Sequence, residues 1–336
     1  MAKHSIRWKI QAIATLLTNA HLVGFFTGKI YKGRLKGLCV PGLNCYSCPG
    51  AIGSCPIGSL QAVIGSSKFA FSYYIVGIMM LFGVLFGRLV CGFLCPFGWL
   101  QELLHKIPSK KYSTKRLKGL TYLKYAILVL FVIVLPLTVV NEVGMGDPWF
   151  CKWLCPAGIL EGAIPLAVVD AGIRAALGAL FTWKSCLLLG IATLCVFFYR
   201  PFCKWICPLG AFYALFNKLS FYRFHVDPRR CTHCGTCSRV CKMDVTVYQT
   251  PNHTECIRCG DCIRACPQGA IYKNTIVRKK EKQDEKIPLR GMRDPLRPIA
   301  DRLRKQRDPG HSETIPRVPG RGFRRKHDHQ RSVCTL

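Results

Sequence analysis

Eight cysteines near residue 250 have the spacing of a metal-binding site. They form two runs of CxxCxxCxxxC, which are Cys231, Cys234, Cys237 and Cys241, then Cys256, Cys259, Cys262 and Cys266. Each iron of a cubic cluster needs a thiolate, and a tight loop with one distant closing ligand can supply all four. We therefore expect one [4Fe-4S] cluster on Cys231, Cys234, Cys237 and Cys266. The second would lie on Cys241, Cys256, Cys259 and Cys262, because the fourth cysteine of each run serves the other cluster.

Paired CxxC runs also bind zinc, which is the alternative reading of these cysteines. Zinc closes with four ligands and has no use for the threefold CxxCxxC, so the spacing favours iron-sulfur clusters. One departure from the ferredoxin pattern is Lys242, which follows Cys241 where proline follows Cys266.

A second set of cysteines occurs as CxxxCP pairs in an apolar part of the chain. The pairs are Cys91 with Cys95 and Cys203 with Cys207. Their surroundings match at a constant offset: Phe86, Arg88, Gly98, Leu103 and Lys106 recur as Phe198, Arg200, Gly210, Leu215 and Lys218. The offset predicts an internal duplication.

The proline after each second cysteine predicts the start of a helix. Proline suits the first helical position, so Cys95 and Cys207 should be N-caps, where the helix dipole favours a thiolate. If the chain crosses the membrane four times, Cys91, Cys95, Cys203 and Cys207 meet on its cytoplasmic side. This inner group could hold a further iron-sulfur cluster, a copper or zinc site, or thiols packed as small apolar residues.

The same reasoning gathers other cysteines on the opposite side. They are Cys45, Cys48, Cys55, Cys151 and Cys155, with Cys39 a little apart. This outer group could hold metal, form disulfides or exchange thiols. A bilayer core of about 30 Å would separate the two cysteine faces, a long distance for electron transfer.

The composition places these cysteines in a membrane protein. Half of the 336 residues are hydrophobic although the net charge is +31, and the two kinds of residue occupy different stretches. Apolar segments near 10–26, 69–89, 121–140 and 176–199 predict about four transmembrane helices in two pseudo-repeats. The first also resembles a signal peptide, but no small-residue cleavage site follows it. A fifth apolar stretch, 156–180, contains Asp170 and Arg174, which argue against a span.

The basic residues give an orientation. The N-terminus and the stretch 88–118 are rich in Lys and Arg, whereas 141–162 is acidic, so both termini should be cytoplasmic. The basic loop 29–36 violates this rule. We expect a membrane domain at 1–222, an α+β two-cluster ferredoxin domain at 223–275, and a basic, disordered tail at 276–336 that contacts anionic lipid rather than nucleic acid.

These motifs together resemble the NapH/NosR group of membrane-bound ferredoxin-type electron carriers, which accompany periplasmic nitrate reductase and nitrous-oxide respiration. The chain is also similar to membrane iron-sulfur proteins that accompany assembly of copper-containing cytochrome oxidase. The resemblance covers about residues 10–272. It implies four spans in a prokaryotic inner membrane, cytoplasmic clusters, and electron delivery from quinol or a cytoplasmic donor to a partner protein.

Two functions follow from these expectations. The first is an electron carrier with two [4Fe-4S] clusters and up to two further iron-sulfur or copper sites. The second is a maturation factor that reduces or handles a metal such as copper. A stand-alone enzyme is less favoured, because no strand is followed by GxGxxG and no nucleophile and base pair is visible.

Overall fold

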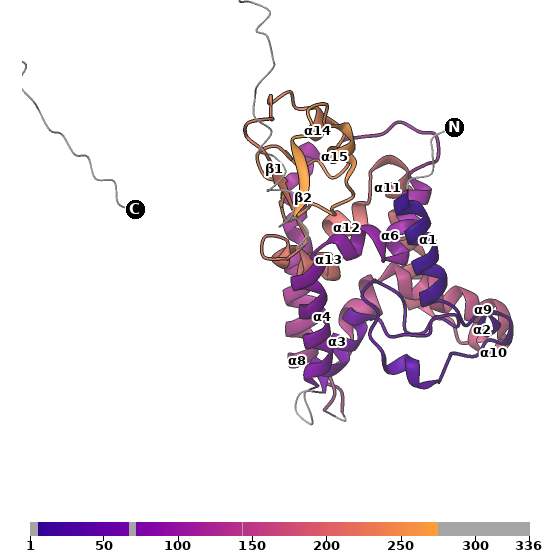
Figure 1. Ribbon diagram of the computed structural model, residues 1–336. Coiled ribbons are helices and arrows are strands. Elements are labelled where there is room, and N and C mark those ends of the chain that lie inside the picture. Colours follow the sequence, from indigo (N-terminus) through magenta and orange to yellow (C-terminus); the bar gives the residue numbers. More distant parts are fainter. Residues whose placement is uncertain (1–5, 67–71, 143, 275–336) are drawn as a thin grey trace, which may run out of the picture. The chain divides into compact units, whose positions relative to one another are not determined.

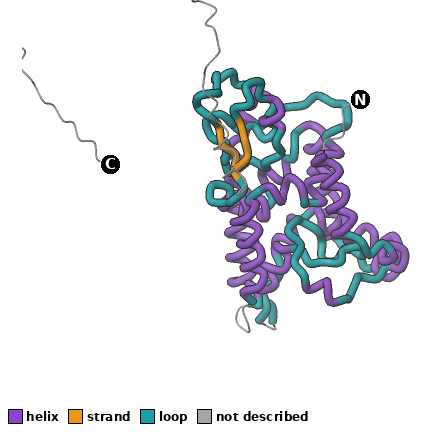
Figure 2. The backbone as a smooth tube through the Cα atoms, in the orientation of Figure 1, coloured by secondary structure: helices purple, strands orange, loops and turns teal. Residues whose placement is uncertain are grey.

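The computed structural model describes residues 6–66, 72–142 and 144–274, and this part of the chain is helical with one small sheet (Figures 1 and 2). The predicted tail at 276–336 lies outside the described residues. The elements are α1 Ile6–Thr18, α2 Val23–Thr27, α3 Pro56–Gly65, α4 Tyr73–Phe86, α5 Leu89–Phe93, α6 Pro96–Leu104, α7 Leu123–Ile127, α8 Leu135–Thr138, α9 Ile164–Val169, α10 Ala171–Ala175, α11 Ala179–Phe197, α12 Pro201–Trp205, α13 Pro208–Phe216, β1 Arg223–Val226, α14 Thr236–Arg239, α15 Asp261–Ala265 and β2 Ile271–Asn274. Further helical turns are the 3-10 segments Arg34–Gly37 and Lys115–Tyr122 and the π-helical segments Leu128–Val134, Phe150–Leu154 and Gly158–Ala163.

Two described helices are long and apolar enough to cross a membrane. One is the continuous helix Lys115–Thr138, which contains α7 and α8 and has 24 residues, with a mean hydropathy of 2.2 over its most apolar 18 residues. The other is α11, with 19 residues and a mean hydropathy of 1.8. They overlap the predicted spans at 121–140 and 176–199. Length and composition thus support two spans.

The helices at the other two predicted spans are shorter. α1 has 13 residues and ends before the polar residues Asn19 and His21, and His21 Nδ1 lies 2.9 Å from the carbonyl oxygen of Pro49. α4 has 14 residues. At about 1.5 Å per residue each reaches roughly 20 Å, less than the bilayer core of about 30 Å. Four membrane-spanning helices therefore stay a prediction.

The fifth apolar stretch, 156–180, is not one helix. It bends at Asp170, whose backbone is extended and whose Oδ1 accepts hydrogen bonds from the backbone N–H groups of Gly172 and Ile173 at 2.8 and 3.2 Å. The carboxylate thus ends α9 and begins α10 as an N-cap. This break agrees with the expectation that the segment is not a span.

The predicted duplication is visible in two matching pairs of short helices. α5 and α12 have five residues each, and α6 and α13 have nine. Cys95 and Cys207 are the N-caps of α6 and α13, as the prolines predicted. The two copies touch through Phe97 and Phe202, whose ring centroids are 5.0 Å apart.

Residues 223–274 fold around one two-stranded antiparallel sheet and two short helices, which Figure 1 shows gathered together. β1 pairs with β2, so that Arg223 lies opposite Asn274 and Val226 opposite Ile271. Phe224 of β1 is buried in one hydrophobic cluster with Val247 and Ile257. The sheet thereby joins the two ends of the predicted ferredoxin domain.

Buried charges hold this domain against the helices before it. Glu255 lies between Arg88, at 2.6 Å from its Nη1, and Lys124, which also donates to the carboxylate. Arg258 donates to the carbonyl oxygens of Phe86 at 2.7 Å and Asn217 at 2.6 Å. Burial alone would raise the pKa of Glu255, but Arg88 and Lys124 outweigh it and hold the pKa below its usual range. A buried charge is tolerated only when paired in this way.

The backbones of the two parts pack closely at Gly92. A Cβ at this position would lie 2.5 Å from the carbonyl oxygen of Ile257, so only glycine fits without movement of the backbone. We expect Gly92→Ala to destabilise the protein by about 2 kcal/mol through overpacking and to lower its melting temperature by several degrees. Thermal unfolding in detergent measures this.

Gly77→Ala in α4 is the matched control, since a Cβ there meets no atom within 4 Å. It should leave the melting temperature unchanged or raise it slightly, because alanine favours helix over glycine. Equal melting temperatures for the two variants would contradict the close contact at Gly92.

Candidate metal centres

Sixteen of the 21 cysteines of the chain come together in four groups of four. All described cysteines are free thiols. The groups are Cys231, Cys234, Cys237 and Cys266; Cys241, Cys256, Cys259 and Cys262; Cys91, Cys95, Cys203 and Cys207; and Cys45, Cys55, Cys151 and Cys155. Each group draws its thiols from two separate stretches of the chain.

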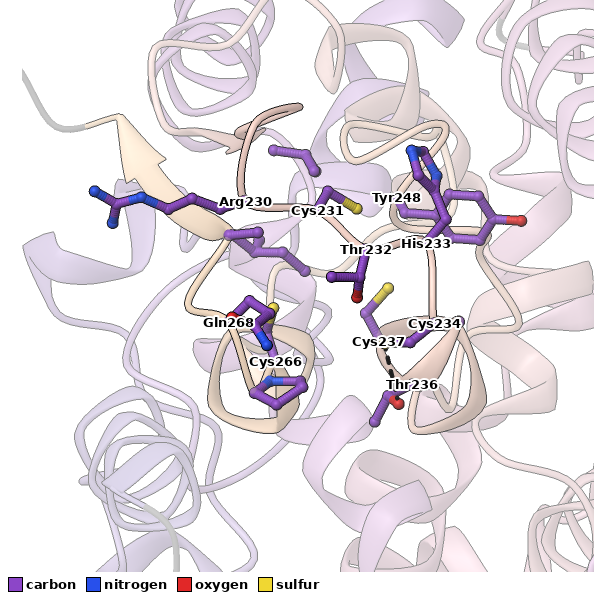
Figure 3. Close-up of a pocket in the computed structure, with 15 residues that line it drawn as sticks. Arg230, Cys231, Thr232, His233, Cys234, Thr236, Cys237, Tyr248, Cys266 and Gln268 are labelled. Atoms are coloured by element: carbon purple, nitrogen blue, oxygen red, sulfur yellow. Dashed lines mark hydrogen bonds between the residues drawn. The ribbon is translucent and has the colours of Figure 1, made fainter. Parts of the chain in front are cut away.

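The first group lines one pocket, as Figure 3 shows. Cys266 reaches this pocket from the second run, and it joins Cys231, Cys234 and Cys237 of the first. Their side chains converge although some thirty residues of sequence separate them. The donor set, four thiols around one pocket, fits a [4Fe-4S] cluster.

The backbone explains how each run curls around its site. His233 and Gly235 have φ angles of 53° and 71°, and Arg258 and Gly260 repeat them at the same places in the second run with 55° and 81°. Left-handed residues on both sides of a cysteine turn the chain tightly, which brings successive thiols to one side. The two runs are therefore copies in conformation as well as in spacing.

The second group consists of three cysteines of the second run and the last cysteine of the first run. Cys262 interacts electrostatically with Cys256, Cys259 and Cys241, so the last cysteine of the first run lies with three of the second. Burial raises the pKa of Cys259 to about 12. Iron binding must therefore displace the thiol protons.

The inner group is buried between the duplicated helices. Cys207 interacts electrostatically with Cys203, Cys91 and Cys95. The backbone N–H groups of Gly98 and Gly210 each lie 3.4 Å from the sulfur of the N-cap cysteine three residues earlier, Cys95 and Cys207 respectively. Cys95 and Cys207 thus each accept a backbone hydrogen bond, which stabilises the thiolate form.

Two arginines connect the halves of the inner group reciprocally. Arg88 Nη2 donates to the carbonyl oxygen of Cys203 at 3.0 Å, and Arg200 Nη1 donates to that of Cys91 at 2.5 Å. Arg200 also pairs with Glu102 at 2.8 Å. Among the described residues, neither Nε atom has a hydrogen-bond partner, although both guanidinium groups are fully buried. Buried cations with spare donors fit a site that carries the negative charge of thiolates and sulfide.

The outer group contains four of the five cysteines predicted for it. Cys155 interacts electrostatically with Cys151, Cys55 and Cys45. The sulfur of Cys48 instead lies 3.5 Å from Asn19 Oδ1, and that of Cys39 lies 3.8 Å from the carbonyl oxygen of Val40.

The inner and outer cysteines are expected to lie about 30 Å apart only if the segments that carry them do not dip inward, and in the structure one of these segments does. The backbone of Leu43 hydrogen-bonds to Cys95 of the inner group, and that of the next residue, Asn44, hydrogen-bonds to Cys55 of the outer group. The loop before α3 folds inward here, and Tyr213 Oη donates to its Pro41 carbonyl oxygen at 3.0 Å. The sequence analysis expected this loop to lie at the membrane surface, because no local sequence pattern predicts that a loop folds toward the interior of a helical bundle.

No three His, Cys, Asp or Glu side chains of the described residues are arranged for a single metal ion. This holds equally for the ferredoxin cysteines. For the ferredoxin cysteines the preference for an iron-sulfur cluster over zinc therefore rests on their spacing in the sequence.

Sequence reasoning missed the polar side chains that contact the thiols. Gln101 Nε2 lies 3.0 Å from Cys203 Sγ, and Gln61 Nε2 lies 3.2 Å from Cys151 Sγ. Both glutamines stand six residues after the cysteine of a Cys-Pro-x-Gly motif, where the other two motifs before residue 223 carry Glu161 and Tyr213. The fourfold occurrence of this motif in the membrane part of the chain was the available signal.

Comparisons with known proteins find 4Fe-4S binding domains over part of these cysteines. Residues 69–115, 123–164 and 180–226 match a family described as a 4Fe-4S binding domain, and residues 250–272 match a second family of the same description. The first three matches each contain one CxxxCP pair. The last contains Cys256 to Cys266. Cys45, Cys55 and the first ferredoxin run, Cys231 to Cys241, lie outside all four matches.

Several curated proteins are similar to the chain. An uncharacterised protein of Methanocaldococcus jannaschii is 26% identical over 186 residues, which are 53% of this chain and 68% of that protein. The methylamine utilization ferredoxin-type protein MauN of Methylorubrum extorquens is 27% identical over 56% of this chain and 55% of its own length. The putative electron transport protein YccM of Escherichia coli is 24% identical over 50% and 45%.

No solved structure matches the chain. The narrower resemblance to NapH and NosR stays a prediction. The chain spans only about half the length of the two bacterial relatives, so their whole activities do not transfer. What the matches do establish is that this chain carries ferredoxin-type 4Fe-4S binding domains and is homologous to ferredoxin-type electron transport proteins.

Proposed function

We propose that the protein is a membrane-anchored iron-sulfur carrier that passes electrons between quinol or a cytoplasmic donor and a partner reductase. In this proposal four helices span a prokaryotic inner membrane, and both termini and the ferredoxin domain are cytoplasmic. The eight ferredoxin cysteines hold two [4Fe-4S] clusters. Cys91, Cys95, Cys203 and Cys207 hold a third.

The observation that carries the proposal is the direct contact between the second ferredoxin group and the inner group. Gly92, beside Cys91, lies against the carbonyl oxygen of Ile257, beside Cys256. Arg88 spans the same junction, because its Nη2 donates to the Cys203 carbonyl oxygen and its Nη1 to that of Thr254, both at 3.0 Å. Two four-thiol sites in contact through the backbone suit electron transfer.

A bound cluster supplies one-electron transfer at each site, and the protein holds the sites and tunes their potentials. Arg88 and Arg200 place positive charge beside the inner thiols without contact to water. Buried cations stabilise the more negative, reduced state of a nearby site. The arginines should therefore raise the reduction potential of the inner group.

A basic cleft beside Cys241 supports a cytoplasmic partner. It is lined by the basic side chains of Lys111, Arg239 and Lys242, together with Lys204, which pairs with Asp244 at 3.2 Å and donates to the Lys242 carbonyl oxygen at 3.0 Å. A negatively charged redox protein would dock there by electrostatic attraction close to a cluster ligand. Lipid contacts are assigned to the exposed faces of the apolar helices.

Iron analysis tests the inner site. The anaerobically purified protein should contain at least about twelve irons per chain, and the double variant Cys203→Ser/Cys207→Ser should lose about four of them. Iron and sulfide content, with low-temperature EPR after reduction, measure this.

Cys186→Ser is the control, since Cys186 is an exposed thiol of α11 outside the four groups. It should keep the full iron content. About eight irons with stoichiometric copper would instead contradict the inner cluster and favour the metal-handling function.

The potential of the inner site tests the role of Arg88. Arg88→Gln should shift this potential to more negative values, because it removes a buried positive charge that touches Cys203. Redox titration followed by EPR measures the shift.

Lys124→Gln is the comparison variant, because Lys124 pairs with the same carboxylate of Glu255 but, among the described residues, donates to no carbonyl oxygen of an inner cysteine. It should shift the potential less. An equal shift in both variants, with iron content intact, would mean that Arg88 acts only through Glu255.

A further inference from the structure

The outer group is built on the same plan as the inner group. Cys55 is the N-cap of α3, as Cys95 and Cys207 are of α6 and α13, and Cys155 likewise precedes a proline. Each of these cysteines begins a Cys-Pro-x-Gly motif. Two motifs contribute to each group, together with one further cysteine from each half.

The glycines of these motifs leave room between the outer thiols. A Cβ on Gly58 would lie 3.7 Å from Cys55 Cβ and 3.8 Å from Cys151 Sγ, and one on Gly158 would lie 4.0 Å from Cys45 Sγ. Gly58 therefore lies between Cys55 and Cys151, and Gly158, in the motif of Cys155, lies beside Cys45. The four cysteines of the outer group are thus neighbours in the fold.

A polar contact is repeated between the two groups. Gln61 Nε2 lies 3.2 Å from Cys151 Sγ, and Gln101 Nε2 lies 3.0 Å from Cys203 Sγ. In both groups the glutamine of one Cys-Pro-x-Gly helix reaches the first cysteine of the opposite CxxxCP pair. Gln61 is itself held in place, because the backbone N–H of Phe150 donates to its Oε1 at 2.9 Å.

The surroundings of the outer group are partly charged. Lys184 Nζ donates to the Cys151 carbonyl oxygen at 3.1 Å, and Glu161 accepts a hydrogen bond from the Cys45 backbone N–H at 2.7 Å. Cys55 and Cys155 are 6% exposed, so water has little access to them. Buried free thiols of this kind do not behave as an exposed disulfide pair.

The two groups are close neighbours. A Cβ on Gly42 would lie 2.9 Å from the Cα of Cys95, and the backbone of Asn44, two residues later, interacts with Cys55. The loop before α3 therefore meets the inner group and the outer group within three residues. Buried Tyr213 interacts electrostatically with Cys95 and Cys55, so it lies at the same junction.

We propose that Cys45, Cys55, Cys151 and Cys155 bind a fourth iron-sulfur cluster that exchanges electrons directly with the inner site. One electron leaves the reduced site, which is oxidised, and reduces the other, and no proton or group moves with it. The proposal of a metal site depends only on the arrangement of these four thiols. Its place in a relay rests on the proposed function, because the inner site supplies its electron or receives it.

Iron content of the full-length protein tests the fourth site. The wild-type protein, purified without oxygen, should hold about sixteen irons per chain, and Cys151→Ser/Cys155→Ser should hold about twelve. Cys45→Ser provides a second, milder variant of the same site. The EPR signals of the ferredoxin sites, unchanged in each variant, show that the protein is folded.

Cys39→Ser/Cys48→Ser is the matched control, because these buried thiols belong to the same loop but not to the group. It should keep all the iron. In the wild type, spin coupling should broaden the reduced inner signal, and this broadening should disappear in Cys151→Ser/Cys155→Ser.

Other outcomes separate the two proposals. About twelve irons in both wild type and Cys151→Ser/Cys155→Ser would overturn the fourth site while the proposed carrier survives. The same holds if alkylation after denaturation reveals disulfides among the outer cysteines. Loss of four irons without any change in the inner signal would keep the metal site and overturn the relay. An inner group without iron would contradict the proposed function itself.

Discussion

The structure depends on the pairing of buried arginines across the duplicated halves. Arg88 and Arg200 each donate to the carbonyl oxygen of a cysteine in the other half, and each meets a carboxylate, Glu255 or Glu102. A buried guanidinium without a partner would be strongly unfavourable, so these contacts specify how the halves fit. The same contacts bring Cys91 and Cys203 together and attach the ferredoxin domain through Glu255. One type of interaction therefore sets both the site and the domain arrangement.

Duplication explains why one short motif serves two different thiol groups. In the membrane part Cys-Pro-x-Gly begins a helix, and its glycine leaves space for the facing stretch of chain, which is a thiol at Gly58 and Gly158 and a cysteine carbonyl oxygen at Gly98 and Gly210. Four copies of the motif occur in this part of the chain, and they are used in pairs. The residue six positions after the cysteine is glutamine in two copies, Gln61 and Gln101, which both reach a cysteine sulfur, and it is Glu161 or Tyr213 in the other two, which bond to backbone groups. The motif thus sets the position of the cysteine at the start of a helix, and the residue six positions later sets the polar contact near each site.

The inner group lies close to its two neighbouring thiol groups because the segments that carry them pack against it. Ile257 approaches Gly92 at one side of the inner group, and Leu43 and Asn44 join it to the outer group at the other. The inner group is consequently in contact with thiol sites on both sides. A protein that only stored metal would not require this continuity, whereas electron transfer depends steeply on distance.

The sequence by itself determined the features that depend on neighbouring residues. The doubled CxxCxxCxxxC predicted loops that the structure repeats at His233 and Arg258, and prolines predicted the N-caps at Cys95 and Cys207. Only the tertiary structure decided which distant thiols meet, so that Cys45 joins the outer group and Cys48 does not. It also ended α1 before His21, which contacts the loop at Pro49. Spacing and capping act within a few residues, but partners far apart in the chain are selected by packing and by the pairing of buried charges.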